Sequence, residues 1–273
     1  MEKNRLTRSF RCLHLHTDAF FWQGVGRLER RDGYWVAKYP SNLGFYWGNA
    51  LIFDEPPGPE SIGQWPAMFA REFTEPEVRH LTFYWDDPSG QRGSASDFEA
   101  RGYVIEDSDV LTASKVHPPP HPVEGLDIRP IESESDWNAI SNCRVEHRDS
   151  QFEERSFREF MEAQHLDYRR MIASNQGSWY GAFMSGNLVA DLGFFTDGRV
   201  GRFKDVFTHP DHRRKGICGA LIYEISRRAL AAGLERIVLV ADHVNDRAAR
   251  IYRSVGYSFE AKAVGMCRYP DAP

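Results

Sequence analysis

The chain has 273 residues, of which 41% are hydrophobic and 27% charged, and its formal net charge is −5 at pH 7. This length favours two modest domains, and the composition is that of a globular protein rather than a disordered or fibrous one. The acidic balance, without a dense block of Lys or Arg, argues against a nucleic-acid binder, because such a protein must neutralise phosphates.

No apolar run approaches the roughly 20 residues that a membrane-spanning helix needs. The first residues, 1–13, are polar and basic and no apolar segment follows them. We therefore expect a cytoplasmic protein with no membrane partner. The cysteines are scattered without a CxxC pair, which favours free buried thiols over a zinc site or a disulfide framework. They are Cys12, Cys143, Cys218 and Cys267.

In the first half, a strand-like run at 50–53 is followed by a loop rich in Pro and acidic residues, 54–59. The pattern then predicts a helix at 61–73 and a strand at 81–85. Several aromatic residues precede these elements, and we expect them in a core rather than on a ligand platform. They are Tyr34, Trp35, Phe45, Tyr46 and Trp47.

The run His117-Pro118-Pro119-Pro120-His121-Pro122 lacks most backbone N–H donors and favours extended backbone. Neither a helix nor a central strand tolerates such a run, so it predicts a linker. We therefore expect an N-terminal domain over residues 1–116, a Pro-rich linker over 117–125 and a C-terminal domain over 126–273.

The second half begins with a predicted strand at 126–131 and a helix that starts near Ser133 or Ser135. A second helix is predicted at 153–173. Three strands then alternate with tight turns and form an antiparallel meander: 179–184, 188–195 and 200–208.

Residues 216–232 form an amphipathic helix whose apolar residues share one face. These are Ile217, Leu221, Ile225, Ala229 and Ala232. A buried strand at 236–241 and a short helix at 247–255 follow, and Asn245 stands where a cap of that helix belongs. Strands continue to Tyr269.

Parts of the two halves are alike. Residues 98–104 and 252–257 both combine a helix end, a glycine and an aromatic residue that begins a strand. The strand at 81–85 mirrors that at 236–241, and the helix at 61–73 mirrors that from Gly216. We interpret the first half as a degenerate copy of the second; coincidence is the alternative, because this local arrangement is common.

A basic segment that contains glycines, 208–219, joins the third meander strand to the amphipathic helix. A helix N-terminus directs unpaired backbone N–H groups and partial positive charge at an anion. Gly216 and Gly219 lack the Cβ that would keep a pyrophosphate from the main chain, and the cations before them add charge. A pyrophosphate-bearing ligand fits, and a basic turn that caps an ordinary helix is the alternative. The patterns GxxxxGK[ST] and GxGxxG are absent.

Two motifs carry a family resemblance. Arg213-x-x-Gly216-x-Cys218 resembles the acyl-CoA loop of the GNAT acetyltransferases, which has Arg or Gln first and a small residue last. Cys218 departs from the Gly or Ala of the pattern but is also small. The second motif is similar to the family's fourth-helix signature: Asn245-x-x-Ala248-x-x-x-Tyr252-x-x-x-Gly256-Tyr257. The resemblance covers residues 126–269.

The resemblance implies an α+β fold of the GNAT type, with a mixed, mostly antiparallel sheet flanked by helices, in tandem if the first half is a degenerate copy. The first half has Pro56-Pro57-Gly58-Pro59-Glu60 where the loop would fall, so we expect no CoA binding there. In the second half the resemblance assigns acetyl-CoA to a set of residues: Val206, Phe207, Thr208, Arg213, Arg214, Lys215, Gly216, Ile217, Cys218, Gly219, Asn245 and Tyr252.

Tyr252 resembles the family's general acid, which protonates the departing thiolate; a core aromatic residue is the alternative. Asp205 is the candidate base, and His209 and His243 titrate in the useful range. Each of the three is also compatible with a solvated or structural role. Asn245 is compatible with a helix cap as well as with a CoA ligand.

The sequence thus predicts an acyl-CoA-dependent N-acetyltransferase that moves an acetyl group from acetyl-CoA to a primary amine. A non-catalytic acyl-CoA sensor or interaction module is the alternative. The pattern leaves open whether the acceptor is a small amine, an antibiotic, a peptide terminus or a protein lysine, and it leaves the oligomeric state open.

Overall fold

The computed structural model describes residues 10–242 and 246–270. Its contacts divide the chain into two compact units, one formed by Met1–Val110 with Ala261–Pro273 and the other by Leu111–Glu260. The divisions therefore fall at 110 and 260 rather than at the Pro-rich run, and the C-terminal strand belongs to the first unit.

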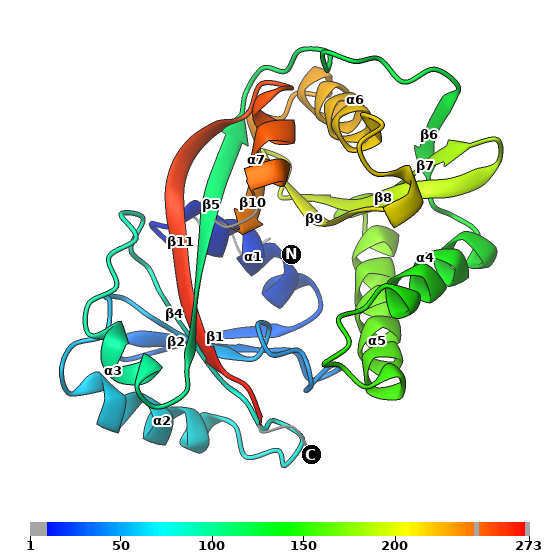
Figure 1. Cartoon of the computed structure of the whole chain (residues 1–273). Coiled ribbons are helices and arrows are strands. Elements are labelled where there is room, and N and C mark those ends of the chain that lie inside the picture. Colours follow the sequence, from blue (N-terminus) through cyan, green and yellow to red (C-terminus); the bar gives the residue numbers. More distant parts are fainter. Residues whose placement is uncertain (1–9, 243–245, 271–273) are drawn as a thin grey trace, which may run out of the picture. The chain divides into compact units, whose positions relative to one another are not determined.

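Among its described residues, the first unit contains three helices and the strands of a mixed sheet, as labelled in Figure 1. Its elements are α1 (Leu13–Gly24), β1 (Arg27–Arg31), β2 (Tyr34–Lys38), β3 (Ala50–Phe53), α2 (Ser61–Glu72), β4 (Leu81–Trp85), α3 (Ala95–Glu99), most of β5 (Val104–Ala113) and most of β11 (Ser258–Arg268).

The strand order in this unit is β1-β2-β3-β4-β11-β5. β1, β2 and β3 pair antiparallel, β3 and β4 pair parallel with α2 between them in the chain, and β11 pairs antiparallel with β4. The core is rich in aromatic side chains: the rings of Phe53 and Trp65 stack at 3.7 Å, and Phe83 and Phe98 pack around them. This cluster fixes α2 and α3 against the sheet.

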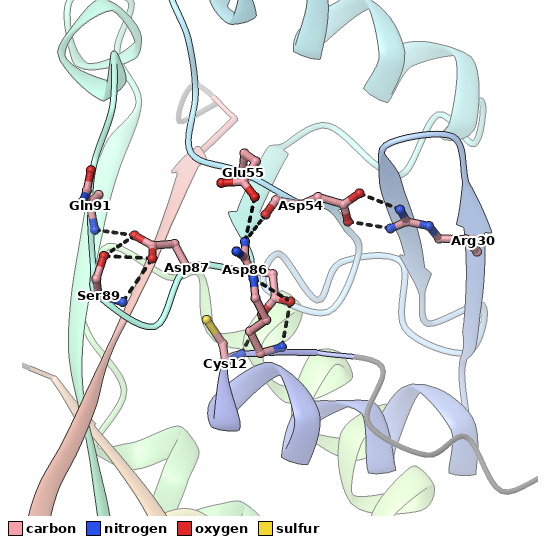
Figure 2. A network of polar contacts seen from close by, with 9 residues as sticks. Cys12, Arg30, Asp54, Glu55, Asp86, Asp87, Ser89 and Gln91 are labelled. Carbon is pink, nitrogen blue, oxygen red and sulfur yellow. Dashed lines mark hydrogen bonds and ion pairs between the residues drawn. The ribbon is translucent and has the colours of Figure 1, made fainter.

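The first helix is capped by a residue that is distant in the sequence. The Asp86 carboxylate accepts hydrogen bonds from the backbone N–H groups of Arg11 (2.8 Å) and Cys12 (2.7 Å), as Figure 2 shows. A carboxylate there satisfies orphan donors and suits the positive end of the helix dipole. The neighbouring Asp87 closes its own loop by accepting from Ser89 and Gln91.

Outside residues 243–245, the second unit contains four α-helices, a short 3₁₀ turn and a mixed sheet. Its elements are β6 (Leu126–Pro130), α4 (Glu134–Glu146), α5 (Glu154–Ala173), β7 (Gly177–Met184), β8 (Asn187–Thr196), β9 (Val200–Thr208), η1 (Pro210–His212), α6 (Ile217–Ala231), β10 (Arg236–Asp242) and α7 (Asp246–Arg253).

Its strand order is β5-β10-β9-β8-β7-β6, with β6 to β9 antiparallel and β9 parallel to β10. α4 begins where predicted, because the Ser133 hydroxyl accepts from the Asp136 N–H at 3.1 Å. Glu153 caps α5 in the same way, at 2.7 Å from the Ser156 N–H. The two helices therefore start at residues whose side chains supply the missing acceptors.

The predicted apolar face of α6 forms much of the core of the second unit. Ile217, Leu221, Ile225 and Ala229 are buried in one cluster with strands β8, β9 and β10, and Ala232 at the helix end is exposed. Because these residues share one face, α6 packs on the sheet with that face. Its N-terminus lies next to the end of β9.

The two halves of the chain repeat one order of elements, although the last strand of the second half, β11, lies mostly in the first unit. In the first, two antiparallel pairings are followed by a parallel pair joined through a helix, then a short helix and a strand: β1-β2-β3-α2-β4-α3-β5. The second repeats it as β7-β8-β9-α6-β10-α7-β11. The expected α+β class and the repeat are both confirmed. Within residues 10–242 and 246–270, no helix is long and apolar enough to cross a membrane.

Candidate functional site

The end of β9 separates from its parallel neighbour. In the described residues, β10 pairs with β9 only from Val200 to Arg202, whereas the antiparallel pairing with β8 continues to Thr208. The register with β8 shifts between Asp191 and Gly193, and Asp205 opposite this shift has φ of +49°. Such a bulge bends the strand. One backbone edge of the last residues of β9 is thus free of a β10 partner.

A basic turn follows directly. η1 is capped by His209, whose Nδ1 accepts from the Asp211 N–H at 3.3 Å. Arg214 has φ of +63° and Gly216 has φ of +79°, so the chain makes two left-handed steps before α6. Glycine adopts this conformation without steric cost, whereas Arg214 does so against its preference. The side chains from Arg213 to Lys215 are exposed and available to an anion.

The first turn of α6 presents its backbone rather than its side chains. Ile217 and Gly219 are buried, and the first helical hydrogen bond runs from the Ala220 N–H to the Gly216 carbonyl at 3.0 Å. The N–H groups before Ala220 are therefore the orphan donors of the helix end. Together with the helix dipole and the exposed cations they form a concentration of positive charge suited to phosphate.

Thr208, Cys218 and Tyr252 lie together beside this turn. The Cys218 sulfur is hydrogen bonded to the Thr208 side chain, and burial raises the pKa of the Cys218 thiol to about 12. Tyr252 is 6% exposed, and its pKa lies well above the usual value because of burial and of the neighbouring Cys218. Both groups therefore keep their protons at neutral pH.

The predicted linker packs against this site within the second unit. A Cβ on Gly216 would lie 3.1 Å from Val123 Cγ2 and 3.2 Å from the His121 carbonyl oxygen. A groove follows, lined by the Pro-rich segment on one side and by Tyr223 and Arg228 of α6 on the other. Glycine at 216 is thus required by its conformation and by the close approach of this segment.

A second group of polar side chains surrounds the bulge. The Tyr168 hydroxyl of α5 donates to Asp205 Oδ2 at 2.9 Å, and Gln164 Nε2 donates to the Tyr168 oxygen at 2.8 Å. Gln164 and Tyr168 are buried, whereas Asp205 is exposed. The chain of donors orients a solvent-facing carboxylate at the bend of β9.

Arg144 of α4 connects the bulge to the interior. Its Nη2 lies 2.7 Å from Asp191 Oδ1 and donates to the Asp205 carbonyl oxygen at 2.7 Å. Asp191 also accepts from Trp179 Nε1 at 3.1 Å. Burial raises the pKa of Asp191, and Arg144 partly offsets this effect. The guanidinium also lies 4.3 Å from the centre of the Phe207 ring, so one side chain braces both sides of the bend.

The buried His165 lines the same cluster. It is hydrogen bonded through Nδ1 to the Ser141 hydroxyl at 2.9 Å, and burial lowers the pKa of its imidazole to about 4. It is therefore neutral at physiological pH. Sequence reasoning did not select Arg144, Tyr168, Asp191 or His165. The available signal was weak: polar residues at apolar-face positions of the predicted helices.

Most residues predicted to bind acetyl-CoA are adjacent in the structure. The end of β9, the basic turn and the first turn of α6 form one continuous surface, and Tyr252 lies beside it through Cys218. Asp205 lies at the bulge three residues before Thr208 and is bonded to α5 instead. Asn245 and His243 lie outside the described residues. The roles assigned to all of these residues stay predictions.

Comparison with known proteins identifies relatives of this chain. Residues 141–257 match the model of the acetyltransferase (GNAT) family. An acetyltransferase of Sodalis glossinidius is 26% identical over 95 residues, which are 35% of this chain and 67% of that protein. A solved GCN5-related N-acetyltransferase from Kribbella flavida is 19% identical with a TM-score of 0.59, over 94% of this chain and 96% of that one.

A solved tandem GNAT protein from the clavulanic acid biosynthesis pathway is 14% identical with a TM-score of 0.51, and the likeness covers 80% of this chain and 74% of that one. At these identities the solved structures show the fold alone. Because the likeness to the Kribbella protein extends over 94% of the chain, it includes the first unit. The predicted GNAT fold and its tandem repetition are confirmed.

Proposed function

Because residues 141–257 form a domain of the acetyltransferase (GNAT) family, we propose that this protein moves an acetyl group from acetyl-CoA to a primary amine. One observation carries the cofactor assignment: β9 leaves β10 after Arg202 and ends at the basic turn and helix N-terminus. A free strand edge suits an amide-bearing arm, and the turn suits the pyrophosphate of the same molecule.

The proposed cofactor lies along Val206, Phe207 and Thr208 with its pyrophosphate at the first turn of α6. Backbone groups supply the contacts at both places, so the buried side chain of Ile217 is no obstacle. Arg213 donates to the Thr208 carbonyl at 3.1 Å, which holds the basic turn close to the strand. The exposed Arg214 and Lys215 complete the charge that faces the phosphates.

In the proposed reaction the neutral amine nitrogen attacks the thioester carbonyl carbon and forms the new C–N bond, and the C–S bond then breaks. The amine proton passes through water to a base, for which Asp205 is the candidate because it is exposed and held by Tyr168. The departing thiolate takes a proton from Tyr252. Burial raises the pKa of the Tyr252 phenol. Loss of solvent around the departing thiolate raises the pKa of the CoA thiol in the same way.

The first test is a thermal melt with and without acetyl-CoA. Ligand at about a hundredfold its dissociation constant adds nearly 2.7 kcal/mol of stability. Release of free CoA thiol is then followed across a panel of primary amines. Binding together with amine-dependent thiol release supports the proposal; a folded protein that neither binds acetyl-CoA nor releases thiol with any amine contradicts it.

The variant Tyr252→Phe separates transfer from binding alone. Loss of thiol release with retained stabilisation by acetyl-CoA supports the acid role. Tyr257→Phe is the matched control, because Tyr257 is also buried, with its hydroxyl 2.7 Å from the Ser226 hydroxyl. Stabilisation by acetyl-CoA with no transfer in the wild type would instead support a non-catalytic acyl-CoA sensor.

A further inference from the structure

Three side chains that do not form a metal-binding motif in the sequence lie close together at the end of β9. Cys143 and His147 lie four residues apart at the end of α4, and His209 follows the last residue of β9. One ligand atom of each lies within 4.8 Å of the others. The cysteine spacing predicted no zinc site, because the third group comes from more than sixty residues further along the chain and only the fold brings it close.

The chemistry of the three groups is that of a borderline-soft metal ion. Thiolate and imidazole ligands suit Zn²⁺, whereas Mg²⁺ and Ca²⁺ prefer oxygen. A tetrahedral Zn²⁺ with bonds of about 2.0–2.3 Å separates its ligands by about 3.5 Å. The three ligand atoms lie within 4.8 Å of one another, so the side chains must rotate inward by about 1 Å to reach this geometry.

The surroundings orient His147 as a ligand. Its Nδ1 lies 2.9 Å from the Cys143 carbonyl oxygen, and because a carbonyl only accepts, Nδ1 must carry the proton. The lone pair is then on Nε2, whereas the contact of 3.8 Å with the Cys143 sulfur is made by Nδ1, so the sulfur and Nε2 must move toward one ion for both to bind it. Metal-binding histidines typically donate their second ring N–H to a carbonyl or carboxylate in this way. The His147 and His209 rings lie 5.1 Å apart at 71°, so they converge without stacking. His209 Nδ1 accepts from the Asp211 N–H at 3.3 Å, so His209 binds an ion through Nδ1 only by exchanging this hydrogen bond for the metal.

The group is accessible from solvent. Cys143 is half-buried. The His209 side chain is 28% exposed, so an ion can reach the group from solvent.

We propose that Cys143, His147 and His209 bind one Zn²⁺ ion, with the fourth position filled by water. The Cys143 sulfur supplies its electron pair to the ion, and its proton passes to the buffer. The site joins the last turn of α4 to the end of β9, one residue from Thr208. This inference is independent of the proposed acetyl transfer, because it concerns other side chains and is tested by metal binding alone.

The test uses the full-length protein freed of metal and titrated with Co²⁺ and then with Zn²⁺. We expect one equivalent of Co²⁺ to give tetrahedral visible bands and a thiolate charge-transfer absorption, both abolished by Zn²⁺. Cys143→Ser should remove the charge-transfer band, and His209→Gln should weaken Zn²⁺ affinity at least about tenfold. Competition with a chromophoric chelator measures that affinity.

Two variants serve as controls. Cys218→Ser keeps the same number of thiols as Cys143→Ser and should retain the band, and the exposed His117→Gln should retain the wild-type affinity. Circular dichroism shows whether each variant is folded, and His209→Gln tests the site even if Cys143→Ser does not fold. Absence of saturable binding, or binding that survives both Cys143→Ser and His209→Gln, overturns the proposal.

Discussion

Replacement of Arg144 by Met should destabilise the second unit far more than loss of an ordinary ion pair. The Arg144 side chain is 14% exposed and that of Asp191 only 4%, with Nη2 and Oδ1 2.7 Å apart. Met replaces the aliphatic stem of the side chain but removes the guanidinium, with its charge and its contact with Phe207. The Asp191 carboxylate is then left buried, with the Trp179 Nε1–H still donating to it. Breaking such a buried pair costs about 3–5 kcal/mol.

The loss of stability in Arg144→Met should become smaller as the pH falls. Burial already raises the pKa of Asp191, and without the cation the pKa rises further. A carboxyl whose pKa is higher in the folded than in the unfolded state binds more protons when folded, so stability increases as pH falls toward the unfolded value. The deficit of Arg144→Met should therefore be largest at neutral pH and shrink toward about pH 5.

Urea unfolding at both pH values measures this difference. Asp191→Asn keeps an acceptor for Trp179 and removes the buried charge, so the double variant Arg144→Met with Asp191→Asn should recover most of the loss. The matched control is Arg155→Met, whose pair with Glu159 is 85% and 64% exposed and should be indistinguishable from wild type. An Arg144→Met variant as stable as this control, or equally destabilised at both pH values, refutes the reasoning.

Three further variants test the site around α6 and β9. The double variant Arg214→Asn with Lys215→Gln removes two exposed charges. Its stability should be unchanged, because Asn tolerates the left-handed φ of +63° at position 214. Calorimetry should show that its affinity for acetyl-CoA is about tenfold weaker. Gly216→Ala should lower unfolding free energy by at least about 1 kcal/mol, because φ is +79° and the Pro-rich segment lies close; a neutral effect in urea melts contradicts this. Tyr168→Phe frees the Asp205 carboxylate and should lower kcat and shift the pH profile of thiol release with KM for acetyl-CoA unchanged; an unaltered profile removes Asp205 from the proposed role.

The elements of the second unit could be predicted because an apolar run, an apolar face or a local start or stop signal marks them. Ser133 caps α4 as expected, and the face of α6 from Ile217 to Ala229 is buried. In the first unit, α1 was not predicted. His14 and Thr17 are buried along with its apolar residues, so the helix shows no clear polar face, and its cap comes from Asp86 more than seventy residues away.

One part of the candidate site could also be predicted from the sequence, and another part could not. The basic turn between β9 and α6 could be predicted, because Gly216 and the cations before it are contiguous in the sequence; its role in phosphate binding stays a prediction. The group around the bulge could not, because Arg144, Asp191 and Tyr168 come from three elements and meet only when β8 and β9 shift register. A register shift leaves no pattern in a single sequence, since it depends on pairing between strands.

The two units show how one order of elements can keep or lose an anion site. In the second, β9 leads to α6 through Gly216 and three exposed cations. In the first, β3 leads to α2 through Asp54, Glu55 and Glu60, and Glu60 itself is the N-cap residue. Carboxylates at a helix N-terminus satisfy the helix dipole internally and repel phosphate. We therefore expect the charge at this one junction to distinguish the two units in acyl-CoA binding, although the strand pairings around it are the same.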